Sequence, residues 1–395
     1  MRSEEHLDKL MATEPSPRYV IGDDPIWREE KNDEHRISRD IKTIANFIRA
    51  IVNSDQTLFS LRSKLQGPEP IHVSYQGRRL LNAVSKRLRE FEEYFPGNSI
   101  NSYIELLRSA VRSDPSLIYA DLDLKSVKGE DARKLYVKLT NLVESLRMEG
   151  RSEAFKKELD ARRRQCQKNQ KSAEDYINAI FKYRASKNLA IRIDLACGCE
   201  TSERRGIVST VDVEQAKEEL DRFVRYIREK YPVTGWMATL EYGLMTGLHF
   251  HVLIFIDGHV QFNGAALGYL FGEHWKSKIT EGRGRYYNCN AAWYRENGVG
   301  MIWHYDAAKR EILMSRVVSY LTKPDFWIKF QGTKKTFFKG LMPSKAEMEA
   351  KENSTGRPRK QIKADSGLEV DLAVYGWGIN VSGLSSDRVG KKAPP

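Results

Sequence analysis

A glycine-bounded turn between two strand-like segments constrains the fold of this chain more than any other sequence feature. Residues 236–242 and 248–256 read as strands, and Gly243 and Gly247 bound the short segment that joins them. Apolar and β-branched runs separated by a short glycine-containing turn are typical of an antiparallel hairpin. The middle of the chain is therefore predicted to contain an antiparallel sheet.

The segments around this hairpin predict an α+β domain over residues 186–338. Apolar residues at 189, 191, 193 and 195 alternate with Ala190, Arg192 and Asp194, which predicts a half-buried strand. Helices are expected at about 213–230, 265–278 and 307–323, with a short strand at 301–305, and Asp306 and Pro324 bound the last helix. The order βαββ(α)βα predicts a ferredoxin-like split βαβ antiparallel sheet with helices on one face.

The N-terminal half carries no chemical signature, and the basic C-terminal tail is expected to add only nonspecific, salt-sensitive affinity for DNA. Residues 1–180 are predicted to be mostly helical, and they could read a DNA site, bind a partner or act as a spacer. Residues 148–171 are so rich in charge that they could be a solvated helix or a linker. Residues 339–395 are expected to be a basic, largely flexible tail, with a possible short strand at 372–377.

The charge of the chain favours a polyanionic partner. With 395 residues and a formal net charge of +12, nucleic acid is the first expectation and an acidic membrane surface the second. The longest apolar run near the centre, residues 252–256, is too short to cross a bilayer. No secretory leader is visible and four dispersed cysteines make no disulfide framework, so a reducing cytoplasm is the expected location.

The strongest chemical signal is the pair His249 and His251, which flank Phe250. Residues two apart on a strand point to the same face, so both imidazoles should project together and Phe250 to the other side. Two neutral imidazoles that close form half of a site for a divalent metal. The alternative is a histidine pair on a half-exposed strand.

The hairpin adds a carboxylate to this pair. A turn centred on Met245 places Glu241 opposite His249 and Thr239 opposite His251. Side chains directly opposite each other on paired strands have Cβ atoms only about 5 Å apart. The predicted Glu-His-His cluster suits Mg²⁺ or Mn²⁺ and does not exclude Zn²⁺.

A second signal is a tyrosine with cations on a later helix. Tyr320 lies three residues before Lys323, and Arg316 one turn before it, so the face that carries the hydroxyl is cationic. Cations favour the phenolate form, which is a nucleophile towards phosphorus. The alternative is a core tyrosine whose hydroxyl reaches solvent at the end of the helix.

Together, residues 247–255 (GLHFHVLIF) and 319–323 (SYLTK) resemble the HUH endonucleases of the replication-initiator type. The nearest likeness is to the inovirus-type replication proteins of phages and prophages, the YagK/YfjJ C-terminal family. The resemblance implies a metal, Mg²⁺ or Mn²⁺, held by Glu241, His249 and His251. It also implies that Tyr320 is the catalytic nucleophile and that Lys323 assists it. Some relatives carry a second tyrosine one turn away, where this chain has Arg316 and Pro324.

The resemblance implies a rolling-circle replication initiator in a bacterial cytoplasm. Tyr320 would nick single-stranded origin DNA, forming a 5′-phosphotyrosine and a free 3′-OH that a host polymerase extends. No G-x-x-x-x-G-K-[ST] loop occurs, so a host helicase would have to unwind the duplex. Two rival functions are a different metal enzyme, such as a hydrolase or cupin-type oxygenase, and a noncatalytic DNA-binding regulator of a prophage or plasmid. The first would not need Tyr320, and the second would bind DNA without the histidines.

Other residues are weaker candidates. Arg283, Arg285 and Trp293 belong to a basic, aromatic stretch that could bind single-stranded DNA, as could Arg316, although an ordinary loop packed by its own aromatics is an equal alternative. Cys197 and Cys199 are separated by one residue, which is poor spacing for zinc. They are expected to be reduced thiols. His304 is expected to be a packed histidine rather than a ligand.

Overall fold

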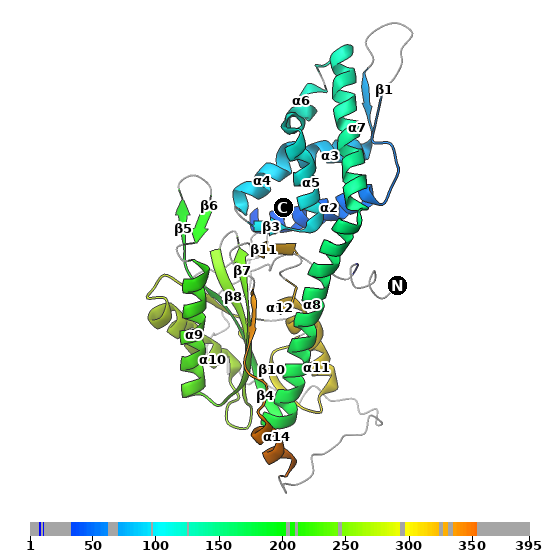
Figure 1. Ribbon diagram of the computed structural model, residues 1–395. Coiled ribbons are helices and arrows are strands. Elements are labelled where there is room, and N and C mark those ends of the chain that lie inside the picture. The colour runs from blue at the N-terminus through cyan, green and yellow to red at the C-terminus, as the bar shows by residue number, and fades with distance from the viewer. Residues whose placement is uncertain are drawn as a thin grey trace, which may run out of the picture. The chain divides into compact units, whose positions relative to one another are not determined.

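The computed structural model has an α+β fold of helices and an antiparallel sheet (Figure 1). It describes Asp8, Met11 and residues 33–61, 70–95, 98–124, 126–202, 206–209, 212–243, 247–292, 297–323, 327–330 and 335–353. The α+β prediction is therefore confirmed. Trp293, Pro324 and the possible strand at 372–377 lie outside the described residues.

The N-terminal part is mostly helical, as its apolar periodicity predicted. Its helices are α2 (Asp33–Val52), α3 (Tyr75–Asn82), η1 (Ala83–Arg87), α4 (Leu88–Tyr94), α5 (Ser102–Ser113), η2 (Pro115–Tyr119), α6 (Ala120–Asp123), α7 (Glu130–Gly150), α8 (Glu153–Ala179) and η3 (Ile180–Arg184). Its strands are only three residues long: β1 (Phe59–Leu61), β2 (Ile71–Val73) and β3 (Asn98–Ile100). Segments so short carry too little alternation to be recognised in the sequence.

Most of the charged segment at 148–171 lies in the long helix α8, which begins at Glu153, and its first three residues end α7. Ser152 caps its start, because the serine side chain accepts a hydrogen bond from the Phe155 N–H. Phe155 packs in the N-terminal core, whereas Tyr176 and Ile177 pack against the sheet. One continuous helix therefore contributes to both cores.

The main sheet has the strand order β10-β4-β8-β7-β12, with β9 also pairing with β4, and every pairing is antiparallel. Its strands are β4 (Lys187–Ala196), β7 (Val233–Gly243), β8 (Gly247–Asp257), β9 (Arg285–Asn288), β10 (Gly300–Trp303) and β12 (Phe337–Lys339). Three small pairings lie outside it: β1 with β2, β5 (Cys199–Ser202) with β6 (Gly206–Ser209), and β11 (Ile328–Phe330) with β3.

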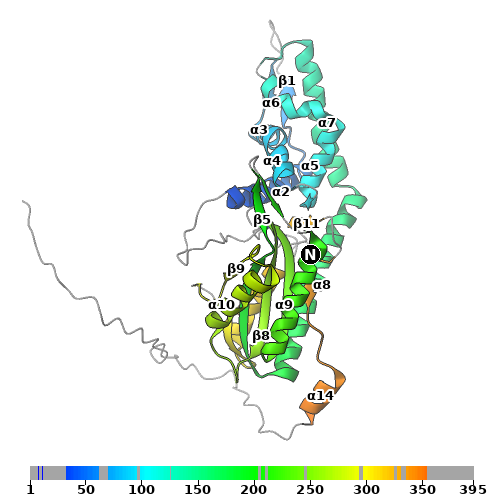
Figure 2. The same ribbon diagram turned by 90° about the vertical axis from the view of Figure 1, so that its left-hand side faces the viewer.

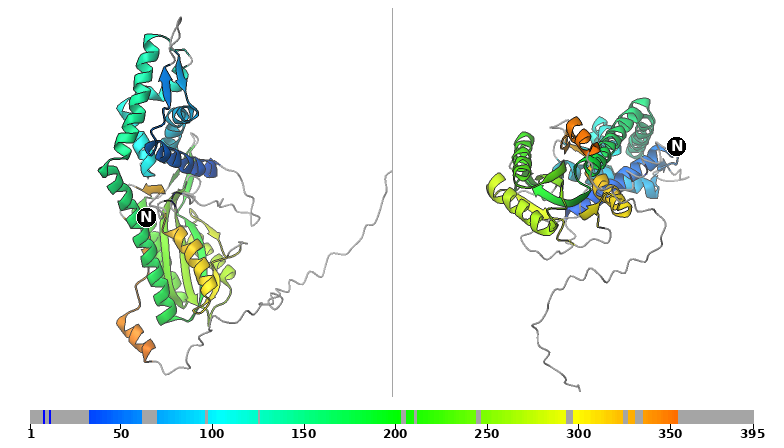
Figure 3. Two further views of the ribbon diagram at one scale, coloured as in Figure 1. Left: turned by 90° about the vertical axis from the view of Figure 1, so that its right-hand side faces the viewer. Right: turned by 90° about the horizontal axis from the view of Figure 1, so that it is seen from below.

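Helices cover both faces of this sheet, so the prediction of helices on one face was wrong (Figures 2 and 3). The helices α9 (Val213–Lys230), α10 (Gly264–His274) and η4 (Trp275–Ile279) pack on one face. The helix α8 and the segment that carries Tyr320 pack on the other. The reason is visible in β8, where Phe250 and Val252 are buried on the first face and Leu253 and Phe255 on the second.

The strand β4 is correspondingly buried on both sides rather than half-buried. Its polar side chains Arg192 and Asp194 are 8% and 3% exposed. A buried charge needs a partner, and these two lie 3.5 Å apart, from Arg192 Nε to Asp194 Oδ1. The alternation of charged and apolar residues in β4 therefore reflects a buried ion pair and not a solvent-exposed face.

The helix predicted at 307–323 is observed as three consecutive segments, α11 (Ala307–Ile312), the π-helical η5 (Leu313–Val318) and α12 (Ser319–Leu321). Asp306 caps its start as predicted, accepting a hydrogen bond from the Lys309 N–H. Leu313, Val317 and Leu321 are buried against the sheet.

Another helix, α14 (Lys345–Glu352), lies within the segment that was expected to be flexible. Ser344 and Glu347 form a capping box at its start, a local signal that the sequence did contain. Among the described residues, no helix combines the length and apolarity needed to cross a bilayer.

Candidate metal centre

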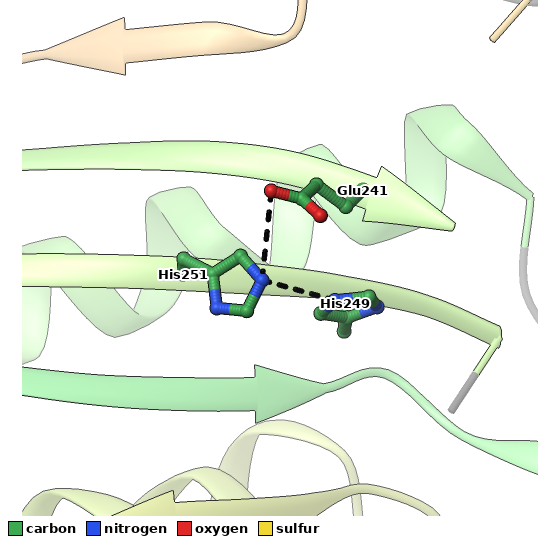
Figure 4. Close-up of side chains that lie close together, drawn as sticks. All are labelled: Glu241, His249 and His251. Atoms are coloured by element: carbon green, nitrogen blue, oxygen red, sulfur yellow. Dashed lines mark hydrogen bonds and ion pairs between the residues drawn. The ribbon is translucent and has the colours of Figure 1, made fainter. Parts of the chain in front are cut away.

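The hairpin β7–β8 has the register that the sequence predicted. Glu241 pairs with His249, and Thr239 pairs with His251. The ligand atoms of Glu241, His249 and His251 all lie within 4.8 Å of one another, in the one such cluster of metal-binding side chains found among the described residues (Figure 4). Both histidines are buried, at 4% and 1% exposed. The predicted Glu-His-His cluster is therefore present.

The two imidazoles present their Nε2 atoms to each other. These atoms are 3.2 Å apart, and Glu241 Oε1 is 3.6 Å from Nε2 of His251. The Nδ1 atom of His249 faces the carbonyl oxygen of Gly247 at 3.1 Å, and Nδ1 of His251 faces Oδ1 of Asp194 at 2.7 Å. With each Nδ1 protonated to face its oxygen, two lone pairs and a carboxylate converge. Such a cluster requires a cation or a proton at its centre.

The pKa values of the histidines reflect this requirement. Burial lowers the pKa of His251, but the carboxylates of Asp194 and Glu241 outweigh burial and raise it to about 9. Burial, together with the neighbouring His251, lowers the pKa of His249. Without a metal, a proton held by the first imidazole keeps the second neutral, because two adjacent imidazolium ions would repel each other.

Asp194 and Arg192 form the layer behind the ligands. Burial raises the pKa of the Asp194 carboxyl, but the Arg192 guanidinium and His251 hold it well below its usual range. Carboxylates behind metal-bound histidines orient the imidazole and increase its basicity. Sequence reasoning missed both residues. The available signal was their position two apart on a strand that pairs with the histidine strand, since Asp194 stands opposite His251.

Tyr320 lies at the edge of the cluster. Its hydroxyl oxygen is 3.2 Å from Nε2 of His251, the nitrogen that also faces His249 and Glu241. The Arg192 guanidinium carbon lies 4.6 Å from the centre of the Tyr320 ring, within the range of a cation–π contact. The phenol is therefore near both the metal ligands and a fixed positive charge.

The bond from the Thr239 hydroxyl to the carbonyl oxygen of Leu321 ties the tyrosine segment to β7. Thr239 is buried beside His251, its partner across the hairpin. The tyrosine and the histidines are thus held together by the same two strands.

The predicted cations Lys323 and Arg316 flank Tyr320 along the chain. The Lys323 N–H donates a hydrogen bond of 3.4 Å to the Tyr320 carbonyl, and the Lys323 side chain is half-buried. Burial and the nearby Arg316 lower the pKa of the Lys323 ammonium. The Arg316 side chain is exposed on the π-helical segment η5.

Two residues of the predicted DNA-contacting stretch have different roles in the structure. Arg283 forms an ion pair of 2.6 Å with the buried Glu219 and donates to the Cys197 carbonyl, so it stabilises the fold. Arg285 is exposed at the start of β9. Tyr286 donates a hydrogen bond of 2.7 Å to Glu273, which favours the interpretation of packed aromatics for this part of the stretch.

Three of the four cysteines and His304 do not belong to the cluster, and the side chain of Cys199 lies outside the described part of the chain. Cys166, Cys197 and Cys289 are free and buried. Burial raises the pKa of the Cys197 thiol, and a protonated thiol is a poor metal ligand. The ring of His304 packs edge-on against that of Tyr305.

Comparison with known proteins yields no match: no family model, curated protein or solved structure matches this chain. The resemblance to HUH endonucleases therefore stays a prediction, and the chemistry of the cluster is the basis for a proposal about function.

Proposed function

We propose that this chain is a metal-dependent nickase of single-stranded DNA that starts rolling-circle replication. The observation that carries the proposal is the 3.2 Å separation between the Tyr320 hydroxyl and Nε2 of His251, the nitrogen around which the other two ligands converge. A tyrosine beside two histidines and a carboxylate unites a nucleophile and a metal site. The alternative metal enzymes, a hydrolase or a cupin-type oxygenase, would not require the Tyr320 hydroxyl at this position.

The residues present fit a divalent metal. Glu241, His249 and His251 would hold it through one oxygen and two nitrogens, a donor set that suits Mg²⁺ or Mn²⁺. A divalent metal fits this site because two imidazole lone pairs and a carboxylate converge there, and a positive charge between them stabilises this arrangement. A bound metal would polarise the scissile phosphate.

The chain's own residues supply the rest of the reaction. The Tyr320 oxygen attacks phosphorus, forming a new P–O bond while the bond to the 3′ oxygen breaks. The phenol loses its proton to solvent and the 3′ oxygen takes one up, which leaves a 5′-phosphotyrosine and a free 3′-OH. Arg192 over the ring stabilises the phenolate, and Lys323 offsets charge that develops on the phosphate.

The strand order supports a ferredoxin-like split βαβ arrangement. The strands β4 and β7 are joined through α9, and β8 lies between them and pairs antiparallel with both. In this arrangement the central strand β8 carries both histidines. The proposed partners are single-stranded origin DNA and a host helicase and polymerase. Arg285 and Arg316 are the exposed cations that we assign to DNA contact.

The proposal is tested with labelled single-stranded DNA from the origin region of the genetic element that encodes the chain, in the presence of Mn²⁺ or Mg²⁺. The expected product is an SDS-stable protein–DNA adduct that needs the metal and is lost in Tyr320→Phe and His249→Ala. Tyr305→Phe is the matched control, because Tyr305 is a partly exposed tyrosine that belongs to no part of the cluster. DNA binding without an adduct under any of these conditions would favour the regulator instead.

A further inference from the structure

The elements α3, η1 and α4 form one continuous helix in the N-terminal part (Figure 1). One face of this helix carries polar and cationic side chains. Its exposed positions up to Arg89 recur every three or four residues, at Tyr75, Arg78, Asn82, Lys86 and Arg89, and the exposed carboxylates Glu92 and Glu93 follow in the last turn. That recurrence places the five positions up to Arg89 on one side of the helix. We call these five residues the α3–α4 stripe.

The opposite side of this helix is fixed to the N-terminal core. Leu80, Leu81, Val84, Leu88 and Phe91 are buried there. Ser74 caps the helix start by accepting a hydrogen bond from the Gly77 N–H. The stripe is therefore presented on a rigid element that does not depend on a ligand for its shape.

The charge of the stripe itself is one-sided. Between residues 75 and 89 the sequence contains five cations and no carboxylate, and the three carboxylates of this helix, Glu90, Glu92 and Glu93, all lie at its end, in α4, beyond the stripe. Two of the five are structural: Arg79 lies over the Phe47 ring, and Arg87 pairs with Asp40 and Glu90. Among the described residues, no hydrogen bond or ion pair engages the side chains of the stripe. The cations that stabilise the fold and the cations turned outward are thus distinct sets.

The composition of the stripe identifies a partner. Arginine and lysine contact phosphates, and arginine and asparagine also match the hydrogen-bonding edges of guanine and adenine in the major groove. An α-helix with side chains is about 10–12 Å across, and the major groove is about 12 Å wide. A single strand would instead call for aromatic rings along the surface, and the stripe has only Tyr75.

We propose that the α3–α4 stripe is a duplex DNA-binding surface, in which this helix enters the major groove and Asn82, between Arg78 and Lys86, faces the bases. The inference does not rest on the proposed nickase activity, since none of these residues belongs to the metal centre. If both hold, the N-terminal part delivers the chain to double-stranded DNA next to the strand that is cut.

The test measures binding of the full chain to a short duplex and to a single strand of the same sequence, by fluorescence anisotropy over a range of salt concentrations. The double variant Arg78→Ala/Lys86→Ala removes two cations of the stripe. It should weaken duplex binding by about tenfold and reduce the slope of log K against log salt by about two, because each lost phosphate contact lowers it by about 0.9. Adduct formation through Tyr320, if present, should be unchanged on single-stranded DNA.

The matched control is Arg225→Ala/Lys230→Ala, which removes two exposed cations from α9. It should leave both the affinity and the slope within twofold of the unaltered chain. Equal losses in the two double variants would reduce the effect to net charge and overturn the proposal. An unchanged slope of log K against log salt in the stripe variant would also overturn the proposal. The same holds if duplex and single strand bind equally and neither double variant weakens either of them.

Discussion

Replacing Asp194 by asparagine should lower the pKa of His251 in the metal-free protein. The Asp194 carboxylate is buried 2.7 Å from Nδ1 of His251, and with Glu241 it raises that pKa from 6.5 to about 9. The rise corresponds to about 3 kcal/mol in favour of the imidazolium. In Asp194→Asn only Glu241 still opposes burial, so the pKa should fall to the ordinary 6.5 or below.

The sign of the linked stability effect follows from the direction of the shift. A group whose pKa is raised on folding contributes stability that is complete below its unfolded pKa and is lost as pH rises through the folded value. The metal-free protein should therefore lose about 3 kcal/mol of unfolding free energy between pH 6.5 and about 9, apart from other titrating groups. Asp194→Asn should lack this loss.

The assay is a histidine NMR titration in the presence of a chelator, with His251→Gln used to assign the resonance. Glu219→Gln is the matched control, because Glu219 is also a buried carboxylate in an ion pair, with Arg283, but lies outside the metal cluster. That control should leave the pKa of His251 unchanged. A His251 resonance that titrates at the same pH in the unaltered chain and in folded Asp194→Asn would show that Asp194 does not raise the pKa of His251.

Three further predictions concern the same hairpin. Metal binding at neutral pH should release about one proton, since His251 is protonated below a pH of about 9. Calorimetry in buffers of different ionisation enthalpy measures the number of protons released. A binding enthalpy that does not depend on the buffer would contradict the charge assigned to His251. Thr239→Val removes the bond to the Leu321 carbonyl and should slow adduct formation more than it weakens Mn²⁺ binding; equal effects on both would contradict its positioning of the tyrosine segment. Phe250→Ala should lower the free energy of unfolding, measured with denaturant, by about 3–5 kcal/mol. It should leave the Mn²⁺ affinity of the folded protein unchanged, because this ring points to the face opposite the histidines. Loss of Mn²⁺ affinity in a variant that still folds would contradict that assignment of faces.

Much of the centre could be predicted because a hairpin fixes its own register. The glycine-bounded turn determined that Glu241 stands opposite His249, and the two-residue period of a strand determined that His251 shares its face. These are local rules, and they apply whatever the rest of the chain does.

The other features of the site depend on contacts between residues that are far apart in the sequence. Nothing local shows that the helix α8 would cover the second face of the sheet and bury Arg192 and Asp194. The approach of Tyr320 to His251 likewise needs the strands and helices between them to be placed first. For Arg283, the pairing with Glu219 could not be foreseen, because 64 residues separate them.

The proposed role of Tyr320 as the nucleophile is tested most directly by locating the covalent bond to DNA. Single-stranded DNA and Mn²⁺ are incubated with the chain, the adduct is digested with protease and nuclease, and the modified peptide is identified by mass spectrometry. We expect a nucleotide linked through phosphate to Tyr320, absent when Mn²⁺ is chelated and absent in His249→Ala. A phosphodiester on another residue, or an adduct that forms equally without both imidazoles and metal, would contradict this proposal.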